Sequence, residues 1–360
     1  MSYNISTLIE CPNVQVALGT ITEKGLNPGA SEPAPELQFL TSPLNERGLQ
    51  QSVVPGQGKL KTVQVVYTPR RLESTVSATV TTGCDDGTSP GQLSTLYELD
   101  ETVGAEAKET YVIKDLAYIC QSNPDYFATQ VAALIDVAKR KMQTDVANQM
   151  SALFGWFATD GGENVSMLTG NSLKTVKTKY TASIDGGKWN PEALQEIIYS
   201  AKNSGFTGTP FIFGSGEIYR YLSLADAAAN TSDGGIDFAK FINGNSAAFM
   251  QSYKMHNALN GSNSTNYFLT VDAGSLFLLQ YNRLKDNISM TGDDALWMGV
   301  VVDPVSGIEW NYKVIKTCTE KITVIVSSAY KVVGLPNDIY GATDRLYKTN
   351  GVLKFGITNS

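Results

Sequence analysis

The strongest pattern along the chain is an apolar stripe that recurs every three or four residues between about positions 125 and 154. This spacing places the apolar side chains on one face of an α-helix. The stripe contains Phe127, Val131, Leu134, Ile135, Ala138, Met142, Val146, Met150 and Leu153. At a rise of ~1.5 Å per residue the predicted helix is about 45 Å long. No second heptad run supports a coiled coil, so we expect a single rigid helix.

Alternating apolar and polar residues predict a long β-hairpin before this helix. Residues 60–68 alternate and are β-branched, and residues 72–80 continue in the same style. Residues 83–91 are rich in glycine and proline and predict a loop tip. The chain then returns through a segment that ends in a predicted strand at 109–119. We expect 60–119 to form a hairpin whose tip projects, with a small β-domain as the alternative.

The first 58 residues are marked by prolines, which exclude a long helix or a central strand. These prolines are Pro12, Pro28, Pro33, Pro35, Pro43 and Pro55. Scattered apolar residues favour an extended arm that lies on a neighbouring chain over a disordered tail. They are Leu8, Val14, Val16, Leu37, Phe39 and Leu40.

The region after the long helix mixes helical and strand patterns. Following a turn-rich stretch at 160–190, the predicted helices span 191–205, 216–229 and 236–243, and the predicted strands span 209–213, 266–271 and 275–281. The end of the chain returns to strands at 297–302, 308–318 and 321–333, and Asn350-Gly351 predicts a type I′ hairpin.

Composition points to a globular protein with a weakly charged surface. The chain has 360 residues, of which 42% are hydrophobic and 18% are charged, and its net charge is −7. The charged fraction lies below the usual ~25%, as suits a protein whose surface is largely contact. No basic run of the kind that coats nucleic acid occurs, and an acidic surface repels packed DNA. No apolar run reaches the ~20 residues that cross a bilayer, and the first residues lack a signal-peptide pattern.

Residues that carry chemistry are sparse. The single histidine, His256, has no matched nucleophile or carboxylate motif and is expected to serve packing or the surface. Gly214-Ser215-Gly216 matches no phosphate loop or nucleophile elbow and predicts a strand-to-helix turn. Asp85-Asp86 and Asp293-Asp294 lack the spacing of a calcium loop. We therefore expect no enzyme, no metal site and no cofactor.

The four cysteines are far apart in the sequence and form no metal-binding motif. They are Cys11, Cys84, Cys120 and Cys318. We expect reduced thiols, with a disulfide between subunits as the alternative.

The order of these parts resembles the major capsid protein of tailed bacteriophages, the Hong Kong 97 fold. Residues 190–222 resemble the helix–strand–helix unit of that family's axial domain, and 266–284 resemble its strand–turn–strand. Residues 303–317 and 320–336 resemble its closing strands. The resemblance covers about 60 to 340, and it lies in patterns and their order more than in invariant motifs.

The resemblance implies an α+β fold with an N-terminal arm, an extended E-loop hairpin, a long spine helix in a peripheral domain and an α/β axial domain. The implied boundaries are 1–58 for the arm, 59–119 for the E-loop, 120–175 for the peripheral domain with its spine helix at about 125–154, 176–290 for the axial domain, and 291–360 for the returning peripheral strands and the tail.

The implied function is that of a structural subunit of a virion, made in the cytoplasm of a bacterial host. Hexamers and pentamers of such subunits close an icosahedral head around double-stranded DNA, without sequence-specific DNA binding and without a membrane. Portal and decoration proteins are further implied partners. The arm's prolines exclude a coiled-coil scaffold segment, so a separate scaffold or the shell protein itself is expected to control assembly. The alternatives are an encapsulin-type compartment shell and another virion structural protein.

Three groups of residues are the expected contacts between subunits. They are Cys84, Asp85, Asp86, Gly87 and Pro90 at the E-loop tip, Leu37, Phe39 and Leu40 in the arm, and Val131, Leu134, Ile135 and Met142 on the spine helix. Some members of the family crosslink lysine to asparagine, but no motif in this chain assigns such a bond.

Overall fold

The structure is a computed structural model in which part of the chain is described. The described residues are 34–41, 50–54, 60–67, 93–100, 103–112, 126–153, 174–177, 201, 206, 210–214, 248–260, 266–281, 295–303, 306–318, 321–334 and 351–358.

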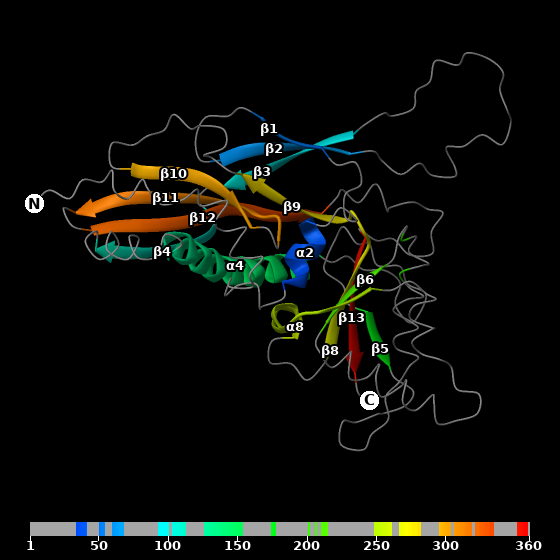
Figure 1. The fold of residues 1–360 in the computed structure, drawn as a ribbon. Helices are drawn as coiled ribbons and strands as arrows, with labels where there is room; N and C mark the ends of the chain where they lie inside the picture. Colours follow the sequence, from blue (N-terminus) through cyan, green and yellow to red (C-terminus); the bar gives the residue numbers. More distant parts are fainter. Residues whose placement is uncertain are drawn as a thin grey trace, which may run out of the picture.

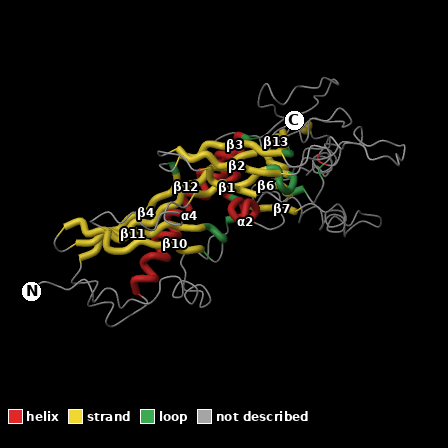
Figure 2. The backbone as a smooth tube through the Cα atoms, turned by 90° about the horizontal axis from the view of Figure 1, so that it is seen from above, coloured by secondary structure: helices red, strands yellow, loops and turns green. Residues whose placement is uncertain are grey.

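A long helix lying along an antiparallel sheet forms the largest part of the described fold (Figure 1). The sheet has the order β10-β11-β12-β4, and β9 pairs with the second half of β12. Its strands are β4 (Gly104–Val112), β9 (Leu276–Tyr281), β10 (Ala295–Val302), β11 (Glu309–Cys318) and β12 (Lys321–Gly334). The helix, α4, spans Tyr126–Ala152 and confirms the predicted long helix. Figure 2 shows the strands in one band, with α4 crossing beneath them.

The apolar stripe of α4 and one face of this sheet make the main core. Trp310 on β11 is fully buried there, and Val324 on β12 also has no exposed surface. Val131, Met142 and Val146 on α4 belong to the same cluster and are fully buried. The apolar residues that recur every three or four positions in the helix thus pack against the apolar residues at alternate positions of the strands.

The hairpin is confirmed in part. Strand β2 (Leu60–Tyr67) pairs antiparallel with β3 (Leu93–Asp100), with Leu60 opposite Asp100, and β1 (Gln50–Val54) adds an edge strand to β2. Of the predicted return strand at 109–119, residues 109–112 are strand as expected and the rest lie outside the described residues, but the predicted partner is wrong. The observed strand is β4, which leaves the hairpin and pairs with β12 in the main sheet.

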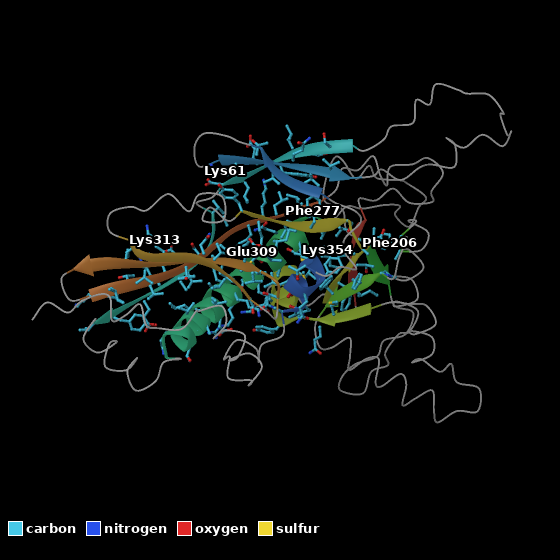
Figure 3. The ribbon with its side chains drawn as sticks, turned by 45° about the horizontal axis from the view of Figure 1, so that its top comes forward. Lys61, Phe206, Phe277, Glu309, Lys313 and Lys354 are labelled. Carbon is cyan, nitrogen blue, oxygen red and sulfur yellow. The ribbon has the colours of Figure 1, made fainter. Side chains whose placement is uncertain are left out.

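The base of the hairpin packs on the body of its own chain. Its buried residues Val63, Val65 and Leu99 form a second core cluster with residues of β9 and β12, namely Phe277, Leu279, Tyr281 and Val333. The Tyr97 hydroxyl also donates a hydrogen bond of 2.8 Å to the carbonyl of Gly334. Figure 3 places Phe277 just below the hairpin sheet. The Lys61 ammonium of β2 lies over the Tyr281 ring of β9, 5.5 Å from its centre.

A second five-stranded sheet has the order β5-β13-β8-β6-β7. Its strands are β5 (Lys174–Lys177), β6 (Phe211–Gly214), β7 (Ala248–Gln251), β8 (Asn266–Val271) and β13 (Val352–Thr358). The strands predicted at 266–271 and 275–281 are confirmed, but they enter different sheets, because the chain turns at Asp272–Ser275. The strand after Gly351 pairs with β8 and β5. A hairpin partner before Asn350 lies outside the described residues.

Two short helices join the sheets. Helix α2 (Pro35–Thr41) is buried against its own chain, which corrects the expectation of a wholly extended arm. Helix α8 (Tyr253–Asn260), which the sequence did not predict, packs between α4 and the second sheet. Of the predicted helix at 191–205, only Ala201 is described, and it is helical and buried. The helices predicted at 216–229 and 236–243 lie outside the described residues.

Gly104 permits the close approach of β4 to β12. A Cβ atom at this position would lie 2.1 Å from the Ser328 carbonyl oxygen, which is too close for any side chain. We expect Gly104→Ala to lower the free energy of unfolding by about 1–3 kcal/mol, because the strands must separate locally. Gly334→Ala is the matched control, since the nearest atom to its added Cβ is 3.6 Å away. Urea unfolding of both variants checks this, and equal losses would contradict it.

Candidate functional site

The arm residues predicted to contact a neighbouring chain lie inside their own chain. Leu37, Phe39 and Leu40 are 0%, 1% and 7% exposed. The Phe39 ring packs against Phe211 at 4.7 Å and Phe213 at 5.4 Å, so α2 closes one side of the second sheet. These side chains pack within their own chain, and their contact with a neighbouring chain stays a prediction.

The apolar stripe of the long helix is buried in the same way, so its contact with a neighbouring chain also stays a prediction. Val131, Leu134, Ile135 and Met142 all lie in the main core, at most 7% exposed. The stripe packs α4 against the sheet of its own chain and so holds the helix in place. The predicted contacts at the hairpin tip, residues 84–90, lie outside the described residues and stay a prediction.

A buried ion pair fixes the middle of α4 to the turn between β10 and β11. The Lys139 ammonium lies 3.0 Å from the Asp303 carboxylate, and both side chains are at most 6% exposed. The Ser306 hydroxyl donates a further hydrogen bond of 2.5 Å to Asp303. The turn then closes through the amide of Gly307, which has a φ of 69° and donates to the carbonyl of Asp303. Charges buried this deeply are tolerated because they are paired and hydrogen-bonded.

The last two turns of α4 are tied to β12. The Tyr330 hydroxyl donates a hydrogen bond of 3.0 Å to Asp145, which also pairs with Lys141 at 2.9 Å. Burial raises the pKa of Tyr330, and the negative charge and hydrogen bond of Asp145 raise it further, so the phenol stays neutral. One turn later the Gln149 side-chain oxygen accepts a bond of 2.8 Å from the amide of Val332. The helix cannot slide along β12 without breaking these contacts.

A third polar cluster joins three helices around Glu36. Its carboxylate accepts hydrogen bonds from the Ser252 hydroxyl and, at 3.0 Å, from the Gln143 side-chain amide. Ser252 precedes α8 and its hydroxyl also accepts a bond of 3.1 Å from the amide of Met255, which makes Ser252 the N-cap of that helix. Glu36 thus connects α2 to α4 and α8 in one buried position.

Exposed apolar side chains lie elsewhere, and sequence reasoning did not single them out. Tyr253 on α8 is 73% exposed, Leu96 on β3 is 62% exposed, Val103 before β4 is 60% exposed, and Val137 on the outer side of α4 is 50% exposed. Leu96 lies on the hairpin face opposite Tyr97, whose ring packs on Phe277. Large apolar and aromatic side chains of this kind are the usual anchors of protein–protein contacts. Only the structure could separate them from the core residues of the same elements.

A cavity of about 530 Å³ lies where the hairpin base, the end of α4 and β12 meet. Its lining residues are Glu98, Leu99, Asp100, Val103, Gln149, Ala152, Leu153, Tyr330, Lys331 and Val332. The lining is mostly apolar, and three of its polar side chains have partners within the chain: Gln149 bonds Val332, Tyr330 bonds Asp145, and the Lys331 ammonium donates to the carbonyl of Glu98. This arrangement suits packing and offers no converging catalytic groups.

The other chemical candidates stay apart. His256 is half-buried on α8, and Gly214 ends β6. Cys318 ends β11, while the remaining cysteines and both acidic pairs lie outside the described residues. Within the described ranges, no group of three or more histidine, cysteine or acidic side chains could hold a metal ion. None of the described helices is both long and apolar enough to cross a membrane.

Comparisons with known proteins find similar solved structures. No protein-family model and no curated protein matches the sequence. The capsid of Myoviridae phage XM1 is similar over 87% of this chain and 90% of that chain, with 11% identity and a TM-score of 0.44. The mature capsid of bacteriophage PhiM1 is similar over 83% and 82%, with 12% identity and a TM-score of 0.39. The capsid of Staphylococcus phage Andhra is similar over 85% and 82%, with 8% identity and a TM-score of 0.35. All three are phage capsid structures, the class that the sequence resembles.

Proposed function

We propose that this protein is the major capsid protein of a tailed bacteriophage and acts as a structural subunit of the virion. The observation that carries the proposal is the 27-residue helix α4, which a buried ion pair and hydrogen bonds fix along an antiparallel sheet. A mixed sheet and a three-stranded hairpin sheet accompany this unit. These parts follow one another along the chain in the order that the sequence resemblance implies.

In this proposal the parts take the roles of the Hong Kong 97 fold. Helix α4 is the spine helix, the sheet of β4 and β10–β12 belongs to the peripheral domain, and the sheet of β5–β8 and β13 belongs to the axial domain. The hairpin of β2 and β3, continued by residues 68–92, is the E-loop. The final strand β13 pairs with β8, so the tail joins the axial sheet and not the peripheral strands.

The exposed apolar side chains offer the surfaces through which copies meet. Leu96 lies on the outward face of the hairpin, and Tyr253 stands at the start of α8 near the second sheet. Burying such side chains between copies contributes about 25 cal/mol per Å² of apolar area. In this proposal, hexamers and pentamers form through them, a separate scaffold or the shell protein itself guides closure, and DNA is enclosed without sequence-specific contacts.

The hairpin tip gives a direct test of the proposal. Deleting residues 83–91 should leave the chain folded, because both described hairpin strands and their core contacts lie outside the deleted part. The loss of an inter-subunit contact should impair closure of the lattice, which electron microscopy and light scattering would report. A matched variant replaces the same nine residues with a glycine–serine segment and separates the effect of length from that of sequence. Normal shells from both variants would show that the tip is not a contact between subunits.

A further inference from the structure

Glu36 is a carboxyl group buried at the point where α2 meets the rest of the chain. It has no exposed surface, although it lies on a short helix near the start of the described chain. Two side-chain donors reach it, the Gln143 amide on α4 and the Ser252 hydroxyl at the cap of α8. Undocking of α2 would break both hydrogen bonds and expose Leu37 and Phe39. The protonation state of Glu36 and the docking of α2 are therefore coupled.

Among the described residues, Glu36 receives side-chain hydrogen bonds and forms no ion pair. On α4 the three basic residues have acidic partners elsewhere, because Lys139 pairs with Asp303, Arg140 with Asp136 and Lys141 with Asp145. The ionisable residues of α8 are Tyr253, which is exposed, and Lys254 and His256, which are half-buried. Of the strands packed on α2, β6 and β7 have no ionisable residue, and β9 has only Tyr281. An ionised carboxylate in such a place loses its hydration without gaining an opposite charge.

This environment favours the neutral acid. Burial raises the pKa of Glu36 above its ordinary value of 4.5, and the hydrogen bonds from Ser252, from Gln143 and from backbone amides oppose that shift without cancelling it. When α2 is undocked, the carboxyl returns to water and to its ordinary acidity. Between pH 4.5 and the raised pKa of docked Glu36, the docked form binds more protons than the undocked form. Docking of α2 therefore weakens as pH rises through this window.

We propose that α2 is a proton-linked latch, in which neutral Glu36 holds this helix against α4 and α8 and ionised Glu36 loosens it. The latch is a property of a single chain and does not depend on the proposed capsid function. In an assembly of copies, it would make the release of the segment that precedes β1 sensitive to pH.

Amide hydrogen exchange of the full-length chain tests the latch. Protection of the α2 amides, corrected for the pH dependence of intrinsic exchange, is compared at pH 4.5 and at about pH 8. We expect protection in α2 to fall several-fold as pH rises, while the amides of 131–150 in α4 serve as the internal reference. In the variant Glu36→Gln, which cannot ionise, α2 should keep the same relative protection at both values.

Two results would overturn the proposal. In the first, the protection of α2 relative to α4 does not change with pH in the natural chain. In the second, this relative protection changes with pH in Glu36→Gln as much as in the natural chain. If that variant does not fold, Ser252→Ala replaces it, because it removes a hydrogen bond that favours the ionised form. A larger fall in α2 protection than in the natural chain would then support the latch, and an equal or smaller fall would contradict it.

Discussion

Replacing Leu134 with aspartate should lower the free energy of unfolding by roughly 4 kcal/mol or more. Leu134 is 7% exposed and belongs to the core between α4 and the main sheet. An aspartate there must either ionise without a partner or fold in its neutral form, and both cost free energy. Urea unfolding followed by circular dichroism measures the loss.

The same helix offers a matched control for this change. Val137 lies three residues further along α4 and is 50% exposed. Val137→Asp introduces the same charge, and Arg140 and Lys141 follow it at three and four residues, where opposite charges attract. Its effect should stay below about 0.5 kcal/mol. Similar losses in the two variants would show that the apolar stripe of α4 is assigned to the wrong face.

Breaking the buried ion pair of α4 should be comparably severe. Lys139→Met removes the ion-pair partner of the buried Asp303 carboxylate, to which the Ser306 hydroxyl still donates a hydrogen bond. Removing one partner of such a pair typically costs roughly 3–5 kcal/mol. Lys141→Met is the matched control, because its ion pair with Asp145 is exposed and is worth only about 0.3–0.5 kcal/mol.

A double-mutant cycle separates the ion pair from the packing of Lys139. Asp303→Asn keeps an oxygen for Ser306 and removes the buried charge that Lys139→Met leaves behind. The double variant should therefore lose less free energy than the sum of the single variants, by at least ~1 kcal/mol. Strict additivity, measured by chemical unfolding of all four chains, would show that the two charges do not act as a pair.

Local patterns predicted most of the individual elements. The spacing of the apolar residues gave α4 to within two residues of each observed end, and the alternation in 321–333 gave β12 to within one. These segments are long and strongly periodic, so burial on one side leaves little freedom in their structure. The same holds for β2, β8 and β9, whose apolar residues lie in the two cores.

Pairing between strands could not be predicted in the same way. β4 joins β12 across more than 200 residues, and β13 joins β5 with Phe355 opposite Lys174. Such partners depend on which surfaces remain after the local elements have formed, and no spacing in the sequence encodes them. The predicted hairpin return failed for this reason, since residues after Asp100 can alternate equally well against β2 or against β12.

The arm shows a signal that was present but misread. The prolines exclude a long helix, yet Pro35 is well suited to the first position of a short one, where its missing amide hydrogen is not needed. Leu37 and Leu40 are three residues apart and Phe39 lies between them, which fits a single buried turn. Glu36 gave no signal of its burial, because its partners on α4 and α8 follow it by 107 and 216 residues.

The central claim, that many copies of this chain build a shell, is tested most directly by electron microscopy of the purified protein, with its mass measured by light scattering over a concentration series. The account predicts rings, tubes or closed shells whose mass is a multiple of that of the chain. Single chains at every concentration, also under crowding that promotes assembly, would contradict it.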